Sequence, residues 1–121
     1  MTKPLAVITG ASSGIGEATA KAFSNAGYPT LLLARRIEIM ESFNLKNSIC
    51  KKIDVRDRDA LVSAIREAEK QYGPTDMMFN NAGVARLADI STQDPSEWDE
   101  MIDVNTKGVM NGIYAVMKDM K

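Results

Sequence analysis

The chain has 121 residues, 45% hydrophobic and 26% charged, a length and composition typical of one globular domain. Fifteen basic and sixteen acidic residues leave a net charge of −1, and no basic run suggests a nucleic-acid or membrane partner. Histidine is absent and Cys50 is the single cysteine, which excludes His-based catalytic triads, an intrachain disulfide and a cysteine-based metal site. We therefore expect no metal.

Short apolar runs alternate with segments of helical periodicity along the chain. We expect strands over residues 5–9, 30–34, 48–55 and 76–80, of which 5–9 and 30–34 are continuous apolar runs. Continuous apolar runs are typical of strands buried on both faces. A helix is expected after each strand, and the last extends from Ser96 to Lys121 with an interruption near Asn105. Pro95 marks its start.

Spacing and capping residues define two of these helices further. The expected apolar face of the first comprises Ile15, Ala18, Thr19, Ala22, Phe23 and Ala26. Gly27 is placed to end that helix. After residue 55, Asp57 is expected to cap a helix that Gly73-Pro74 stops. The apolar face of this second helix comprises Leu61, Ala64, Ile65, Ala68 and Tyr72.

The regular alternation of strand and helix predicts the fold class. It indicates an α/β fold of the Rossmann-like, doubly wound type, in which a parallel sheet carries helices on both faces. Crossovers between parallel strands are right-handed.

Three glycines lie where the first strand gives way to the first helix. Gly10 allows a tight turn, Gly14 lets backbone approach a pyrophosphate, and Gly16 lets the helix pack near the sheet. The helix N-terminus offers unpaired N–H groups to phosphates. A nucleoside-triphosphate loop requires Gly-Lys-Ser/Thr after its last glycine, whereas Ile15-Gly16-Glu17 stands here. The turn therefore predicts a dinucleotide site.

The spacing of these glycines resembles the Thr-Gly-x-x-x-Gly-x-Gly motif of the short-chain dehydrogenase/reductase family. Three further motifs of that family follow in order: Asp54-Val55, Asn80-Asn81-Ala82-Gly83 and Asn105. The resemblance implies an oxidoreductase that transfers a hydride between a nicotinamide cofactor and a small carbonyl or alcohol. Around the turn and the second motif it implies cofactor contacts from Gly10, Ser12, Ser13, Gly14, Ile15, Gly16, Asn81, Ala82 and Gly83, while Asn80 is expected to tie strands together.

The end of the second strand indicates which cofactor is bound. An acidic residue there would favour NAD, but Ala34 is followed by Arg35 and Arg36. Guanidinium groups match a phosphate in bidentate geometry. The resemblance implies that Arg35 holds the 2′-phosphate of NADP, while Arg36 stacks on adenine or assists. It also implies that Asp54 accepts a hydrogen bond from the adenine amino group, with the amide of Val55 beside it.

Asn105 is the catalytic residue that the resemblance implies within this chain, as the anchor of a water in a proton relay. The family's general acid/base is a tyrosine followed four residues later by a lysine, and Tyr114 and Lys118 fit that spacing literally. Nine residues separate Asn105 from Tyr114, which is two and a half helical turns and about 13 Å along the axis. Tyr114 should therefore point to the opposite face, and we interpret the match as accidental.

The family's serine and its true Tyr-x-x-x-Lys follow a further strand. We therefore expect residues 1–121 to be the N-terminal, dinucleotide-binding half of one incomplete Rossmann-like domain, inactive alone, with the catalytic serine and tyrosine downstream of residue 121. The alternatives are an NAD-dependent enzyme of the same fold, or a non-catalytic dinucleotide-binding module if the chain ends here.

The long final helix carries a second apolar face. Met110, Tyr114 and Met117 point away from Asn105, and in the resembled family such helices often pair across a two-fold axis. We therefore expect a homo-oligomer formed through residues 96–121. The apolar runs are too short to span a bilayer and no signal peptide is recognised, so a cytoplasmic protein is expected.

Overall fold

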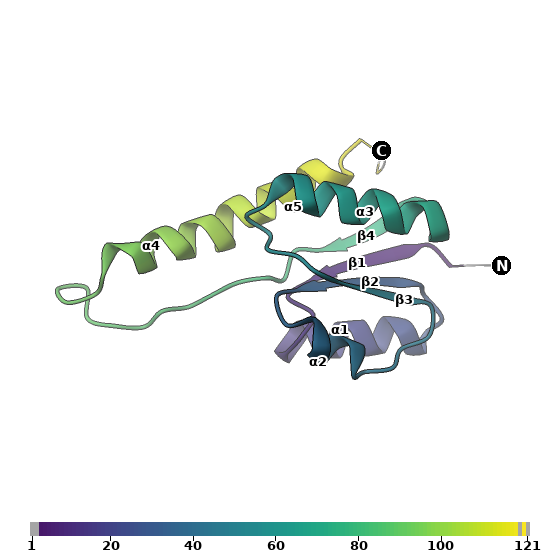
Figure 1. The fold of residues 1–121 in the computed structure, drawn as a ribbon, viewed down its shortest axis with the longest axis horizontal. Helices are drawn as coiled ribbons and strands as arrows, with labels where there is room; N and C mark the ends of the chain where they lie inside the picture. Colours follow the sequence, from purple (N-terminus) through teal and green to yellow (C-terminus); the bar gives the residue numbers. More distant parts are fainter. Residues whose placement is uncertain (1–2, 119, 121) are drawn as a thin grey trace.

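A computed structural model describes residues 3–118 and 120, and it places a parallel sheet between helices (Figure 1). The elements are β1 (Leu5–Thr9), α1 (Gly14–Asn25), β2 (Thr30–Ala34), α2 (Ile37–Glu41), β3 (Ser48–Lys52), α3 (Arg58–Tyr72), β4 (Thr75–Phe79), α4 (Pro95–Ile102), the π-helical turn η1 (Asp103–Lys107) and α5 (Gly108–Val116). The strand order is β3-β2-β1-β4, and every described pair is parallel. The expected α/β fold is confirmed.

Two hydrophobic clusters fill the space on either side of the sheet. Figure 1 shows α3 and α5 over one face and α1 and α2 over the other. Alternate residues of β1 and β2 point to opposite clusters: Val7 and Leu33 pack under α3 and α5, while Ile8 and Leu32 pack with Met40 of α2. Both strands are buried along their whole length, which is why their sequences read as continuous apolar runs.

Helix α3 forms as its sequence indicated. The Asp57 side chain accepts a hydrogen bond from the amide of Ala60 at 3.1 Å, and Gly73 ends the helix at a φ of 86°. Four of the five residues expected on its apolar face are buried, and Tyr72 packs against them: Leu61, Ala64, Ile65 and Ala68.

The expected apolar face of α1 is only partly correct. Phe23 packs against Phe79 of β4, with 5.1 Å between the ring centroids, but most of the other expected residues face solvent. Ile15 is 77% exposed and Ala22 is exposed, whereas Gly16 and Ala20 are the buried residues of this helix. The cause is the distance between helix and sheet, because a Cβ on Gly16 would collide with the carbonyl oxygen of Gly10. The part of α1 closest to the sheet, at Gly16 and Ala20, therefore carries its smallest residues.

Strand β3 ends earlier than expected. It stops at Lys52, and only the amide of Ile53 extends the pairing, by donating to the Ala34 carbonyl at 3.1 Å. Asp54 and Val55 lie in the turn that follows, where the Asp57 amide donates to the carbonyl of Asp54 at 2.9 Å. Both residues are therefore placed beyond the carboxyl edge of the sheet.

The final helix is interrupted around Asn105, as expected. Asp94 caps α4 by accepting a hydrogen bond from the Ser96 amide at 2.9 Å, with Pro95 at the first helical position. The π-helical turn η1 then joins α4 to α5, which ends at Val116. The expected end at Lys121 lies outside the described residues. Within the described part, no helix has the length and apolar character needed to cross a membrane.

Glu69 joins the end of α3 to the start of β4. Its Oε2 accepts hydrogen bonds from the Thr75 amide at 3.0 Å and the Thr75 hydroxyl at 2.8 Å, and its Oε1 accepts one from Arg66 at 2.6 Å. Burial raises the pKa of Glu69, but the hydrogen bonds from Thr75 and Arg66 outweigh burial. The pKa of this carboxyl is therefore below its ordinary value.

We predict that Glu69→Gln lowers the free energy of unfolding by about 1.5–3 kcal/mol at neutral pH, because hydrogen bonds to an ionised group are lost. Glu67→Gln is the control: Glu67 is 65% exposed and pairs with Lys51 at the surface, so its effect should stay below about 1 kcal/mol. Urea denaturation measures both.

The Glu69 effect should also depend on pH. A carboxyl with a lowered folded pKa stabilises the fold above its unfolded pKa, and this contribution is lost as the pH falls through the folded pKa. The difference between parent and Glu69→Gln should therefore shrink below about pH 4. An equal difference at pH 7 and pH 3 would contradict this role.

Candidate functional site

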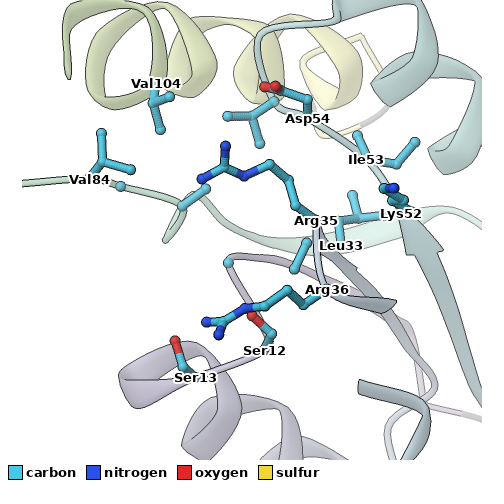
Figure 2. Close-up of a pocket in the computed structure, with 15 residues that line it drawn as sticks. Ser12, Ser13, Leu33, Arg35, Arg36, Lys52, Ile53, Asp54, Val84 and Val104 are labelled. Carbon is cyan, nitrogen blue, oxygen red and sulfur yellow. The ribbon is translucent and has the colours of Figure 1, made fainter. Parts of the chain in front are cut away.

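A pocket of about 610 Å³ opens at the carboxyl edge of the sheet (Figure 2). In the sheet, β1 lies between β2 and β4. The pocket opens at the carboxyl end of β1, which is the switch point at which ligands bind in open α/β sheets. Its lining comprises Gly10, Ser12, Ser13, Leu33, Ala34, Arg35, Arg36, Lys52, Ile53, Asp54, Val55, Ala82, Gly83, Val84 and Val104.

Most of the cofactor-binding residues expected from the sequence meet in this lining. Those that do not line it are Gly14, Ile15, Gly16 and Asn81. Gly14 and Ile15 are exposed at the start of α1, whereas Gly16 is buried beneath the turn. The sequence thus located the turn correctly but did not separate the residues that face the pocket from those that support it.

The glycine turn leaves the N-terminus of α1 open. Gly10 and Gly14 have φ values of 63° and 55°, in the left-handed region that favours glycine. Ser13 precedes the helix, and its side chain makes no capping hydrogen bond to the described residues. A Cβ on Gly14 would contact nothing within 4 Å. The first N–H groups of α1 are therefore accessible to an anion.

A buried threonine supports this turn from below. The Thr9 hydroxyl donates to the Phe79 carbonyl at 3.3 Å and accepts hydrogen bonds from the amides of Asn81 at 2.9 Å and Ala82 at 3.0 Å. The Asn81 side chain donates to the Gly10 carbonyl at 3.2 Å. Sequence reasoning did not give Thr9 a role, although its place at the last position of a buried strand pointed to one.

Asn81 therefore does the strand-tying that we expected of Asn80. The Asn80 side chain lies against α5, where a Cβ on Gly112 would collide with its Oδ1. Within the described residues this oxygen accepts no hydrogen bond.

The two arginines beyond β2 extend in different directions. Figure 2 shows the guanidinium of Arg36 beside Ser12 and Ser13, whereas Arg35 extends toward Val84 and Val104. Ala34 is only 9% exposed, so Arg35 and Arg36 are the first long side chains past the strand end to reach the pocket.

Asp54 and Lys52 complete the charged lining. Arg56 donates to the Asp54 carboxylate from its amide at 2.9 Å and from its guanidinium at 2.6 to 3.1 Å. Hydrogen bonds from Arg56 are the largest cause of the lowered pKa of Asp54, and they outweigh burial, which raises it. Lys52, which sequence reasoning missed, is the last residue of β3 and adds a cation to the pocket. Basic side chains outnumber carboxylates in the lining, which suits a polyanion.

Asn105 is engaged with the loop after β4. Its Nδ2 donates to the Val84 carbonyl at 2.7 Å, and its Oδ1 accepts from the Val84 amide at 2.8 Å. Gly83 makes room for it, because a Cβ there would lie 3.2 Å from Oδ1. The side chain thus joins the loop to η1 at the border of the pocket.

Tyr114 lies away from the pocket. Its side chain is 55% exposed on α5, and the guanidinium of Arg58 lies 5.8 Å from the ring centroid. Tyr114 and Lys118 do not line the pocket, in agreement with the interpretation that their spacing is accidental. Among residues 3–118 and 120, no three Cys, Asp or Glu side chains gather as a metal site would require.

Comparison with known proteins relates this geometry to a family. The family model described as short chain dehydrogenase matches residues 4–121. An uncharacterized oxidoreductase of Listeria monocytogenes is 41% identical over 117 residues, covering 92% of this chain and 47% of that protein. The acetoacetyl-CoA reductase of Paracoccus denitrificans is 34% identical over 119 residues, covering 97% of this chain and 49% of the relative.

A solved structure shows the same likeness. The alcohol dehydrogenase of the archaeon Thermococcus sibiricus, complexed with 5-hydroxy-NADP, matches 95% of this chain and 52% of its own with a TM-score of 0.87 at 29% identity. The chain therefore spans about half the length of the relatives it matches.

We predict that Gly16→Ala abolishes binding of a nicotinamide dinucleotide and lowers the free energy of unfolding by about 2 kcal/mol or more, because the new methyl group would displace Gly10 and Asn81. Gly73→Ala is the control. It has a φ of 86° and open space around it, so it should cost about 1–2 kcal/mol and leave binding intact. Calorimetric titration and urea denaturation measure the two effects. Normal binding by Gly16→Ala would contradict the close seating of α1.

Proposed function

The chain belongs to the short chain dehydrogenase family, and on that premise we propose that it supplies the cofactor-binding part of an oxidoreductase that transfers a hydride between NADP(H) and a small carbonyl or alcohol. One observation carries the proposal: a single pocket gathers the glycine turn, two arginines and the Asp54–Val55 segment. The nicotinamide, when bound, supplies or accepts the hydride. The substrate class agrees with the reductase and alcohol dehydrogenase named among the relatives.

The residues present fit a dinucleotide. A volume of about 610 Å³ lies within the range of about 300–1,000 Å³ for cofactor sites. The pyrophosphate is proposed to lie over Gly14 at the N-terminus of α1, where a Cβ would meet nothing. The adenine is proposed to lie beside Asp54 and Val55. The nicotinamide half is proposed to lie toward Ala82 and Gly83.

The preference for NADP over NAD is proposed to depend on both arginines, with a division of roles that differs from the expectation. Figure 2 shows the guanidinium of Arg36 beside the hydroxyl groups of Ser12 and Ser13, and this placement favours Arg36 as the ligand of the 2′-phosphate. Arg35 is then the residue nearer the adenine, because it extends toward Val104. NAD is the alternative cofactor.

Catalysis is proposed to need residues beyond this chain. Asn105 is the catalytic contribution that we assign within it, through its place between the loop after β4 and η1. The serine and the Tyr-x-x-x-Lys of the family are proposed to follow residue 121, because the chain spans about half of each relative it matches. Residues 1–121 alone would then bind the cofactor without catalysing turnover. We also propose that the protein is located in the cytoplasm.

A homo-oligomer is proposed to form through α5. Large apolar side chains that are about half exposed or more lie on the outward side of this helix and at the residue that follows it: Met110 (64%), Ile113 (48%), Tyr114 (55%) and Met117 (58%). Such patches often mark contacts between proteins.

We predict that the parent protein binds NADP more tightly than NAD, and that Arg36→Gln weakens NADP binding roughly tenfold to a hundredfold by removing a charge-assisted phosphate contact. NAD is the internal control, because it lacks the 2′-phosphate and should bind the parent and the variant equally. Arg35→Gln should weaken both cofactors. Fluorescence titration gives the dissociation constants.

Two outcomes would contradict this assignment. Equal affinities of the parent for both cofactors would mean that the end of β2 does not select NADP. A larger loss of NADP selectivity in Arg35→Gln than in Arg36→Gln would return the 2′-phosphate to Arg35.

Substitutions of Tyr114 test whether this residue acts in catalysis or in the contact between subunits. In the intact protein, Tyr114→Phe should leave turnover of carbonyl and alcohol substrates unchanged, since the ring lies away from the pocket. Tyr114→Glu should shift the protein toward monomer in light scattering, because it places a charge in the exposed apolar face. A general acid/base lost at this position would instead lower turnover by about 10²- to 10⁴-fold in Tyr114→Phe, which would overturn the interpretation.

A further inference from the structure

A polar side chain is buried where α5 meets the turn after β3. Asn111 is 1% exposed although it lies within an apolar helix. Its Nδ2 donates to the Val55 carbonyl at 2.8 Å, and its Oδ1 accepts from Nε of Arg58 at 2.9 Å. Both ends of the amide are therefore used, and they join α5 to the turn after β3 and to the start of α3.

Arg58 determines which way this amide points. A guanidinium only donates hydrogen bonds, so Arg58 must face Oδ1 of Asn111. This leaves Nδ2 toward the Val55 carbonyl. Without Arg58 the amide could rotate and set its oxygen against another oxygen.

The peptide that Asn111 binds is also held at its other end. The Val55 carbonyl and the Arg56 amide belong to one planar peptide unit. The Arg56 amide donates to Oδ1 of Asp54 at 2.9 Å, so the same peptide carries a hydrogen bond from Asn111 on one side and gives one to Asp54 on the other. A continuous series of hydrogen bonds therefore runs from Arg58 through Asn111 to the carboxylate in the pocket.

Close packing keeps this peptide in place. Gly108 lies one turn before Asn111 on the same side of α5, and a Cβ there would collide with Cγ2 of Val55. Val55 is only 7% exposed yet lines the pocket. The helix thus fixes both the side chain and the carbonyl of Val55.

We propose that Asn111, oriented by Arg58, is a positioning residue that sets the direction of the Asp54 carboxylate and so selects adenine as the base of the bound nucleotide. This inference rests on the proposed function, in which adenine lies beside Asp54. A rigid peptide directs the carboxylate at the 6-amino group. A mobile peptide would let the carboxylate move away from the base together with Arg56, the exposed guanidinium that is bound to it.

The test compares NADP with nicotinamide hypoxanthine dinucleotide phosphate, which carries an oxo group in place of the 6-amino group. The intact parent protein should favour NADP roughly tenfold to a hundredfold, the worth of a hydrogen bond to an ionised acceptor. Asp54→Ala should abolish that ratio and so sets the reference for complete loss. Asn111→Leu should move the ratio most of the way toward that reference.

Two further variants separate positioning from stability. Arg58→Met removes a surface side chain and leaves Asn111 in place. It should also lower the ratio, and it provides the test if Asn111→Leu does not fold. Arg66→Met is the matched control: Arg66 donates to the Ala115 carbonyl at 2.8 Å across the same contact between α3 and α5, farther along from the pocket. It should reduce stability and leave the ratio of affinities unchanged.

The possible failures are distinct. If Asn111→Leu and Arg58→Met weaken both nucleotides equally and keep the parental ratio, Asn111 is structural only and the inference is overturned while the proposed function stands. If the parent binds neither nucleotide, or favours neither, the proposed adenine site itself fails and takes the inference with it.

Discussion

The buried hydroxyl of Thr9 joins the two strand ends between which the pocket opens. β1 and β4 run parallel, and their chains diverge where they end, one into the glycine turn and the other into the loop after Phe79. The hydroxyl bonds to the Phe79 carbonyl and to the amides of Asn81 and Ala82, so one side chain contacts three backbone groups where β4 ends. The geometry of the turn and that of the loop are therefore set together.

Glycines, which have no side chain, are as important to the site as this hydroxyl. Gly10 and Gly16 allow the turn, the loop and α1 to approach one another, and Gly108 and Gly112 do the same for α5 against Val55 and Asn80. Asn111 is the buried polar side chain that α5 itself brings to that second contact. A buried amide is costly unless both of its ends are bonded, and here both are.

The sequence predicted the order of elements, the parallel sheet and the turn that borders the pocket, because these follow from periodicity and glycine spacing. It failed for the buried side of α1, since periodicity finds the largest apolar residues while the short distance to the sheet selects the smallest, Gly16 and Ala20. The different directions of Arg35 and Arg36 depend on the backbone path beyond β2, which no local pattern encodes. Nothing in the sequence indicated the role of Asn111, because its partners Val55 and Arg58 are more than fifty positions away along the chain.

The long reach of the Thr9 hydrogen bonds also has a kinetic consequence. Thr9 and Asn81 are 72 positions apart, so their contact closes a loop that contains every element from α1 to β4. Contacts of such separation are paid for in loop entropy and form slowly. On a ribosome adding about 5–20 residues per second, the Asn81 codon is translated roughly 4 to 14 s after that of Thr9. During that interval the glycine turn of a nascent chain has been synthesised but the loop after β4, which completes the pocket, has not. A nucleotide can therefore stabilise the fold only after this loop is made.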